Sequence, residues 1–200
     1  SPVDSSQWAS PVVSVRKPDG AIRLCGDDKR TLNPQLDMMI YPLPIVEDCF
    51  VSMKGGQHFS KIDIKQAYNS IPLRESDQLL ATINTHRGLY KPLSLPFGIN
   101  SATSIFQSIM DKELLGLEFV TCRVDDILIS GDTTESHVKR LYDVTGRLEQ
   151  CGFKCRWDKS EFLKESVVYL GYEISRDGVR PCRSKVETLA KAPYPIKLTE

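Results

Sequence analysis

Three aspartates of this 200-residue chain stand where a charged side chain is costly. Asp63 lies near the end of the apolar run Phe59–Ile64, and Asp125 and Asp126 interrupt the apolar segment Phe119–Ser130. Burying even one unpaired carboxylate is strongly unfavourable, so three of them close together need cations between them. Two divalent cations about 4 Å apart meet that need and clamp the attacking and leaving oxygens of a phosphoryl displacement. The three aspartates are therefore candidate metal ligands of a phosphoryl-transfer site.

The pattern of the aspartates alone leaves a plainer explanation open. Adjacent aspartates are common in solvated turns, and Asp27-Asp28 is such a pair. The apolar run Ile127–Ile129 directly after Asp125-Asp126 favours the metal site, because charges embedded in a core hairpin need a partner.

Composition decides little about function. Lys and Arg together number 26 and balance 26 Asp and Glu, whereas nucleic-acid-binding proteins usually carry a basic surplus. Cations held by an acidic cluster would supply the missing positive charge. No apolar run approaches the ~20 residues of a membrane span, and no secretory leader is seen, so we expect no membrane partner. The start at Ser1 and the unfinished pattern at Glu200 indicate a piece of a longer protein.

The six cysteines are scattered, and only Cys151 and Cys155 are close in sequence. With three histidines and no Cys-x-x-Cys pair, the spacing argues against a structural zinc site. We expect reduced thiols in an intracellular protein.

Short apolar runs between Pro- and Gly-rich turns predict strands in the first hundred residues. These predicted strands are Pro11–Arg16, Ala21–Cys25, Phe59–Ile64 and Leu79–Asn84. Pro18-Asp19-Gly20 predicts the turn of a hairpin between the first two, a protrusion suited to reaching a ligand.

The second half predicts two helices. The first begins at a cap formed by Asn100 or Ser101. Its apolar face is predicted to hold Ile105, Phe106, Ile109, Met110 and Leu114. The second runs over Thr134–Gln150, and its inward face is predicted to hold Val138, Leu141, Tyr142, Thr145 and Leu148.

Strands are expected on either side of the second helix. Phe119–Ser130 predicts a tight hairpin with the paired aspartates at its turn, and Phe153–Trp157 and Val167–Ser175 predict later strands. From residue 59 the order is strand, helix, paired strands, helix, strand, which is the split βαβ pattern of ferredoxin-like folds. The predicted fold class is α+β.

Eight short motifs follow one another along the chain. Each of them is common by chance, but their occurrence together in this order is highly specific for one family. They are Trp8–Val13 with Lys17–Gly20, Arg23–Asp27, Tyr41–Pro44, Phe59–Tyr68, Leu95–Gly98 with Phe106-Gln107, Val124–Leu128, Tyr169–Tyr172, and Gly178–Pro181. In these motifs the chain resembles the reverse transcriptases of Ty3/gypsy-type long-terminal-repeat retrotransposons and their retroviral relatives.

The resemblance implies a polymerase right-hand fold with a ferredoxin-like palm. Fingers would span 1–44 and 65–100, with 45–64 leading into the palm, 101–176 forming it, and 177–200 linking to an absent thumb. The implied activity is that of an RNA-directed DNA polymerase, which uses two Mg²⁺ (or Mn²⁺) ions to transfer a nucleotide onto a primer 3′-hydroxyl.

The resemblance also implies partners and a location. The partners would be an RNA or DNA template with its primer, dNTPs, and the rest of a pol polyprotein with thumb, RNase H, integrase and protease. By analogy, copying would take place in a cytoplasmic virus-like particle.

Residue roles follow from the matched motifs alone. The implied metal ligands are Asp63, Asp125, Asp126 and the backbone carbonyl of Ile64. The implied nucleotide-binding residues are Lys17, Arg23, Tyr68, Phe97 and Gly98, with Tyr68 excluding a ribose 2′-hydroxyl. The implied template and primer contacts are Gln107, Arg123, Val124, Leu170, Gly171 and Tyr172. Lys159 is an implied proton donor to the leaving pyrophosphate.

Three positions depart from the family pattern. Arg123 replaces an aromatic residue before the paired aspartates, where it would either pair with an aspartate and compete with the metals or bind primer phosphate. Asp28 replaces an aromatic residue and would add negative charge near the triphosphate path. Thr103 replaces a proline at the start of the helix.

Two other functions remain open. A catalytically silent retroelement remnant would keep the fold and act as a nucleic-acid-binding or interaction module. A nuclease could hold two metal ions with the same three aspartates. That function would not explain the presence of Tyr68, Leu95–Gly98 and Leu170–Tyr172.

Overall fold

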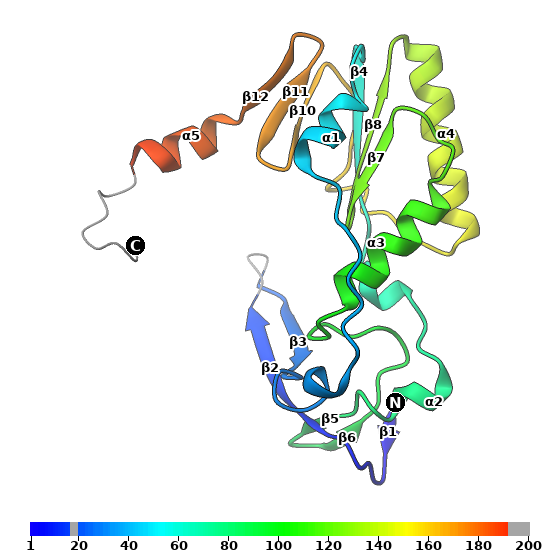
Figure 1. Ribbon diagram of the computed structural model, residues 1–200, viewed down its shortest axis with the longest axis vertical. Coiled ribbons are helices and arrows are strands. Elements are labelled where there is room, and N and C mark those ends of the chain that lie inside the picture. Colours follow the sequence, from blue (N-terminus) through cyan, green and yellow to red (C-terminus); the bar gives the residue numbers. More distant parts are fainter. Residues whose placement is uncertain (17–19, 192–200) are drawn as a thin grey trace.

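Three sheets organise the part of the chain that the computed structural model describes, residues 1–16 and 20–191. A four-stranded sheet with two long helices forms one end of the molecule, and a five-stranded sheet forms the other (Figure 1). A three-stranded sheet packs beside the four-stranded one. The α+β class predicted from the sequence is confirmed.

The four-stranded sheet has the strand order β7-β8-β4-β9, and its neighbours are antiparallel. Its strands are β4 (His58–Asp63), β7 (Val120–Arg123), β8 (Asp126–Gly131) and β9 (Glu161–Lys164). Helix α3 (Ala102–Glu113) precedes β7, and α4 (Thr134–Gln150) links β8 to β9. The order strand, helix, two strands, helix, strand is the split βαβ arrangement that the sequence predicts.

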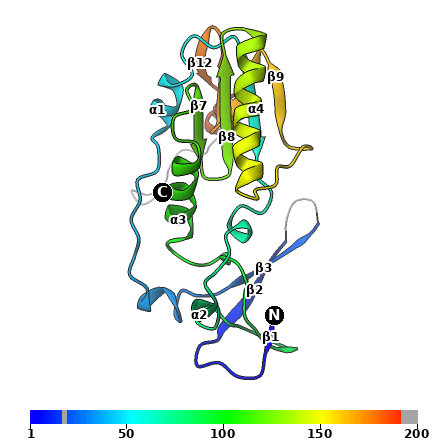
Figure 2. The same cartoon turned by 90° about the vertical axis from the view of Figure 1, so that its right-hand side faces the viewer.

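Both faces of this sheet are covered, which explains the apolar run Ile127–Ile129 in β8 and the burial of Phe59 and Ile62 in β4. Helices α3 and α4 cover one face, as Figure 2 shows. The buried cluster on that face includes Ile62, Ile64, Phe106, Met110, Ile127, Ile129, Val144 and Leu148.

The opposite face is covered by α1 (Val46–Val51) and by β10 (Ser166–Tyr169) and β11 (Tyr172–Ser175). The second buried cluster lies there and consists of Cys49, Met53, Phe59, Leu128, Val167, Tyr169 and Ile174. The ends of β4 and β8 are thus fixed from two sides.

The five-stranded sheet has the order β1-β6-β5-β2-β3. Its strands are β1 (Pro2–Val3), β2 (Ser10–Arg16), β3 (Ile22–Gly26), β5 (Ile83–Thr85) and β6 (Gly88–Tyr90). The predicted hairpin of β2 and β3 is confirmed by five antiparallel residue pairs. Residues 17–19 of its predicted turn lie outside the described residues. The short helices η1 (Asn33–Gln35), η2 (Tyr68–Ser70) and α2 (Glu75–Gln78) complete this half.

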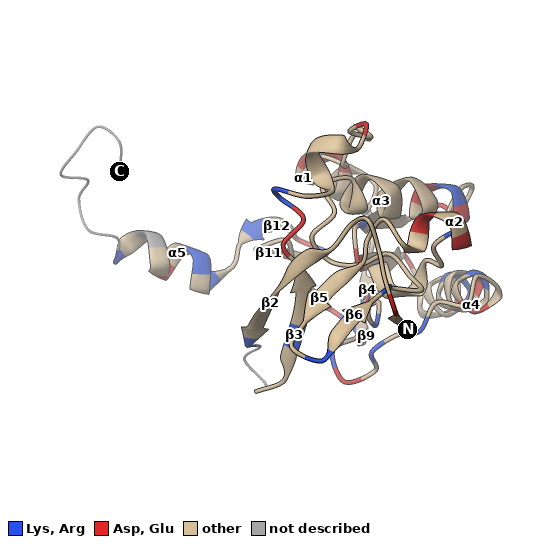
Figure 3. Ribbon diagram, turned by 90° about the horizontal axis from the view of Figure 1, so that it is seen from below, with Lys and Arg blue, Asp and Glu red and all other residues tan. Residues whose placement is uncertain are grey.

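The third sheet adds β12 (Gly178–Pro181) to β10 and β11. Helix α5 (Arg183–Ala190) follows β12 and projects away from the body of the molecule, with basic residues along it (Figure 3).

Three predicted strands are wrong in their extent. The run Leu79–Asn84 was predicted as one strand, but the observed strand β5 begins at Ile83 and ends one residue later, at Thr85. Residues 79–81 instead continue the turn after α2. Phe153–Trp157 contributes a single bridge from Cys155 to Ile64, and the strand of the sheet is β9 instead. The run Val167–Ser175 is two strands, because Leu170 and Gly171 have φ of 51° and 79° and turn the chain back.

The second predicted helix has the predicted bounds, Thr134–Gln150. Thr133 and Ser136 form a reciprocal capping box at its start, which satisfies two free backbone amides. Tyr142 was wrongly predicted to face inward and is 73% exposed, whereas His137 and Val144 are fully buried.

The first predicted helix is confirmed over Ala102–Glu113, but its predicted side-chain cap is wrong. Ser101 Oγ accepts a hydrogen bond from the backbone N–H of Met39, 3.2 Å away, instead of capping the helix. Its hydroxyl therefore ties the extended segment before α1 to the start of α3.

In residues 1–16 and 20–191, no helix is both long and apolar enough to cross a membrane. All six cysteines are free thiols.

Candidate active site

The backbone brings three aspartates to one end of the central strands. Asp63 is the last residue of β4 and pairs directly with Asp126, the first residue of β8. Asp125 lies in the turn before Asp126, and its carbonyl accepts a 3.0 Å hydrogen bond from the backbone N–H of Ile64. The hairpin and the end of β4 are therefore locked together where the acidic residues lie.

The turn that presents Asp125 depends on a buried amide side chain. Val124 has φ of 56°, a conformation that β-branched residues rarely adopt. Its backbone N–H donates to Gln107 Oε1 over 2.8 Å, and Gln107 Nε2 donates to the carbonyl of Cys122 over 2.9 Å and to Asp111 Oδ1 over 2.8 Å. Gln107 on α3 thus holds both sides of the turn.

Burial and mutual repulsion disfavour charge on two of the aspartates. Burial raises the pKa of Asp63, opposed by nearby Arg156 and reinforced by Asp125 and Asp126. Burial also raises the pKa of Asp126, opposed by Lys61 and reinforced by Asp125. A carboxylate cluster of this kind is stabilised by cations placed among its oxygens.

Two basic side chains of the chain face these carboxylates. Arg156 Nε lies 3.6 Å from Asp63 Oδ1, and Lys61 Nζ lies 3.5 Å from Asp126 Oδ1. Among the described residues, no three His, Cys, Asp or Glu side chains are gathered into a ready metal site. The donor set still fits divalent cations that prefer oxygen, because carboxylates and the Ile64 carbonyl are hard oxygen ligands.

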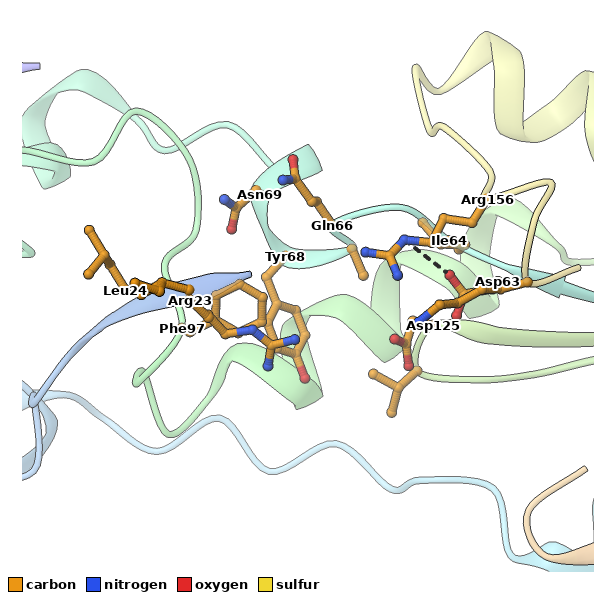
Figure 4. A pocket seen from close by; sticks show the side chains of 14 residues that line it. Arg23, Leu24, Asp63, Ile64, Gln66, Tyr68, Asn69, Phe97, Asp125 and Arg156 are labelled. Atoms are coloured by element: carbon orange, nitrogen blue, oxygen red, sulfur yellow. Dashed lines mark ion pairs between the residues drawn. The ribbon is translucent and has the colours of Figure 1, made fainter. Parts of the chain in front are cut away.

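A pocket of about 670 Å³ connects the acidic end of the sheet with the β2–β3 hairpin. Figure 4 shows Asp63 and Asp125 at one end of it and Arg23, Phe97 and Tyr68 at the other. Ile64, Val124, Arg156 and Lys159 also line it. Arg23 thus lies at the end of the pocket away from Asp63 and Asp125, whereas Arg156 lies beside Asp63.

The far end of this pocket is built on aromatic contacts. The Arg23 guanidinium carbon lies 4.6 Å from the centre of the Phe97 ring, a cation–π contact. Tyr68 packs edge-on against Phe97 and Phe106, with ring centres 5.3 and 5.8 Å away. The Tyr68 hydroxyl lies 2.9 Å from Thr103 Oγ1, within hydrogen-bond distance. Thr103, which replaces a proline of the family pattern, therefore helps to fix Tyr68.

Gly98 and Asp28 lie behind the pocket wall. Gly98 has φ of 114°, and a Cβ there would overlap the carbonyl oxygen of Gly26. Asp28 is only 2% exposed and accepts a 2.6 Å hydrogen bond from Ser10 Oγ. The expectation that Asp28 would place negative charge near a triphosphate is wrong, because its carboxylate faces inward.

Other residues predicted from the resemblance lie away from the pocket. Gln107, predicted to support the template strand, is fully buried, so its side chain is not exposed for direct contact with such a strand. Leu170, Gly171 and Tyr172 form the β10–β11 turn, where Tyr172 contacts Phe50 and Lys185. Lys17 lies outside the described residues.

Arg123, which replaces an aromatic residue of the family pattern, lies next to the paired aspartates at the end of β7. Within the described residues, it forms no ion pair with an aspartate, although its neighbour across the hairpin is Asp126. The cations that do pair are Lys61 and Arg156. Strand alternation places Lys61 on the same face as Asp63 and could have identified it. Arg156 is far from Asp63 in sequence and gives no such signal.

Comparison with known proteins gives consistent matches. The sequence model of the family described as reverse transcriptase (RNA-dependent DNA polymerase) matches residues 15–174. The uncharacterized protein K02A2.6 of Caenorhabditis elegans is 39% identical over 97% of this chain and 15% of its own length. The Transposon Tf2-3 polyprotein of Schizosaccharomyces pombe is 33% identical over 94% of this chain and 14% of its length. This chain thus spans about a seventh of these curated relatives.

Solved structures share the fold. The foamy viral protease-reverse transcriptase dRH in complex with double-stranded DNA superposes with a TM-score of 0.90 at 23% identity, covering 98% of this chain and 34% of that one. The same viral protein in complex with an RNA/DNA hybrid gives a TM-score of 0.85 at 21% identity, covering 96% of this chain and 26% of that one.

Proposed function

Because this chain belongs to the reverse transcriptase (RNA-dependent DNA polymerase) family, we propose that it is the catalytic core of a Ty3/gypsy-type retrotransposon polymerase. It would copy a template by transferring nucleotides from dNTPs onto a primer 3′-hydroxyl. The observation that carries this proposal is that Asp63 and Asp125 line one end of a pocket whose other end holds Arg23, while Asp126 pairs directly with Asp63 across the sheet.

The donor set supports two-metal chemistry. When bound, two Mg²⁺ or Mn²⁺ ions would activate the primer hydroxyl and neutralise charge on the triphosphate. Asp63, Asp125, Asp126 and the Ile64 carbonyl would hold them. Raised carboxylate pKa values at Asp63 and Asp126 support this assignment, because an added cation relieves the repulsion that raises them.

The remaining pocket residues would bind and orient the nucleotide. Arg23 would contact the triphosphate, and its contact with Phe97 holds the guanidinium at the pocket wall. Tyr68, fixed by Thr103, would lie against the sugar and discriminate against a 2′-hydroxyl. Lys159 lines the pocket and would donate a proton to the leaving pyrophosphate.

The fold supports a division into subdomains and a set of partners. The four-stranded sheet with α3 and α4 would be the palm, and the five-stranded sheet would be the fingers. The β10–β11 turn, Arg123 and Val124 would face the primer. Template–primer, dNTPs and the remainder of a pol polyprotein are the proposed partners, within a cytoplasmic particle.

A primer-extension assay tests the proposal. The chain, joined to the sequence that follows it in its gene, is given an RNA template, a labelled DNA primer, dNTPs and Mg²⁺ or Mn²⁺. Primer extension that disappears in Asp125→Asn is expected. Duplex binding without extension would instead indicate a silent remnant, and cleavage without extension would indicate a nuclease.

A further inference from the structure

A basic side chain lies beside Asp63, one of the proposed metal ligands. Arg156 Nε is 3.6 Å from Asp63 Oδ1, and the two side chains are 26% and 22% exposed. Water screens such a partly buried pair less than a surface pair. Arg156 therefore satisfies the charge of a residue whose proposed partner is a metal ion.

The backbone holds Arg156 in this position. Arg156 N–H donates to the carbonyl of Asp63 over 2.8 Å, and Asp63 N–H donates to Ser160 Oγ over 3.2 Å. Ser160 Oγ in turn donates to the carbonyl of Arg156 over 2.6 Å. This closed ring of hydrogen bonds fixes the backbone of Arg156 at the end of β4 and makes no use of the guanidinium.

The guanidinium also lies within the pocket proposed to receive the triphosphate. Arg156 lines that pocket together with Asp63, Asp125 and Lys159, and Figure 4 shows it reaching over Asp63. A planar guanidinium binds carboxylate and phosphate with the same donor geometry. Rotation of the side chain alone can therefore exchange one anion for the other.

We propose that Arg156 is an internal counter-ion with two positions. It pairs with Asp63 while no divalent cation is bound, and it turns to the triphosphate oxygens when a nucleotide arrives with its cations. This inference rests on the proposed function. Its consequence is that the free protein binds a divalent cation alone weakly, and that nucleotide and cation bind together more readily than either does separately.

Lys159 provides a matched control in the same loop and pocket. Within the described residues, it carries the same charge as Arg156 but forms no ion pair with Asp63. Arg156→Gln and Lys159→Gln each remove one positive charge, so any difference between them isolates the ion pair from the general loss of charge. Circular dichroism would show that both variants keep the fold.

The experiment has two parts. The first measures the affinity of the protein for Mn²⁺ alone by electron paramagnetic resonance, and the second measures the affinity for dTTP at saturating Mn²⁺. Arg156→Gln is expected to bind Mn²⁺ alone roughly three- to tenfold more tightly than Lys159→Gln. The same variant is expected to bind dTTP roughly three- to tenfold more weakly than the wild-type chain. The two effects have opposite signs, which a merely structural role would not produce.

Two results would overturn the inference. Equal Mn²⁺ affinity in the two variants, or dTTP affinity unchanged in Arg156→Gln, contradicts the two positions of Arg156 while leaving the proposed polymerase intact. Mn²⁺ binding that is absent from the wild-type chain and from both variants contradicts this inference and the proposed metal site together.

Discussion

At the scale of single residues, the acidic cluster carries a cost that the folded protein tolerates. Asp63 and Asp126 are partly buried, close to Asp125, and offset by Arg156 and Lys61. Active sites commonly keep such groups at the expense of stability, because the same charges are needed for function. The free energy of unfolding should therefore rise when the negative charge of one of these aspartates is removed.

Asp63→Asn is expected to stabilise the metal-free chain. The folded-state pKa of Asp63 is raised above its ordinary value of 3.8, so at neutral pH its ionised form opposes folding. Because Asp63 is partly exposed and water screens its charge, we expect only a small rise of the unfolding midpoint at pH 7, on the order of 1–2 °C. Thermal unfolding in chelator measures it.

The stability gained by Asp63→Asn should decrease as the pH falls. As pH falls through the raised pKa towards 3.8, the folded wild-type chain takes up a proton before the unfolded chain does, and the difference from Asp63→Asn shrinks. Asp132→Asn is the control, because hydrogen bonding by Ser136 lowers the pKa of Asp132 and its charge favours folding. A loss of stability in Asp63→Asn would contradict the account.

Thr103→Val tests whether the hydroxyl beside Tyr68 matters for nucleotide choice. The substitution keeps the shape of Thr103 but removes the partner of the Tyr68 hydroxyl. One hydrogen bond contributes about 1 kcal/mol, so we expect discrimination between dNTPs and rNTPs to fall roughly fivefold. Thr103→Ser should retain it. Incorporation kinetics with each nucleotide measure the change, and an unchanged ratio in Thr103→Val would show that Tyr68 is fixed by packing alone.

At the scale of elements, the β7–β8 hairpin presents Asp125 and Asp126 only because α3 supports it. The side chain of Gln107 joins the N–H of Val124 and the carbonyl of Cys122, while Val124 itself is in a conformation unfavourable for a β-branched residue. The geometry of the turn is therefore imposed by tertiary contact rather than by local preference.

Gln107→Leu should weaken the hairpin and the whole domain. It leaves a buried N–H and a buried carbonyl without partners, each of which costs roughly 1–3 kcal/mol. Urea denaturation would measure the loss, with Ser108→Ala on the same helix as the control. Stability within about 0.5 kcal/mol of the wild-type chain would mean that the hairpin does not depend on Gln107.

The sequence predicted the elements with strong periodicity and missed those set by turns. The bounds of Thr134–Gln150 follow from its apolar period and its cap, whereas Leu170 in the run Val167–Ser175 adopts a left-handed turn that no local pattern marks. The three aspartates were identified from their apolar surroundings. Arg156 was missed, because nothing in the sequence shows that a loop after α4 folds back onto the end of β4.

At the scale of the whole molecule, the pocket joins two halves that the chain crosses more than once. Arg23 and Phe97 come from the half with the five-stranded sheet, and Asp63 and Asp125 come from the end of the four-stranded sheet. A ligand that contacts both ends must bridge the two halves. The proposed nucleotide, with its anionic triphosphate and its cations, has the charge distribution to do so.

The rate of a single nucleotide addition tests the central claim most directly. Single-turnover incorporation of one dNTP onto a primer is compared between the wild-type chain, Asp125→Asn and the control Asp158→Asn, each joined to the following sequence of its gene. Asp158 is exposed and does not line the pocket. The account predicts that Asp125→Asn lowers the rate by roughly 10³-fold or more, with duplex affinity unchanged, while Asp158→Asn has little effect. A rate for Asp125→Asn within about tenfold of the wild-type rate would contradict it.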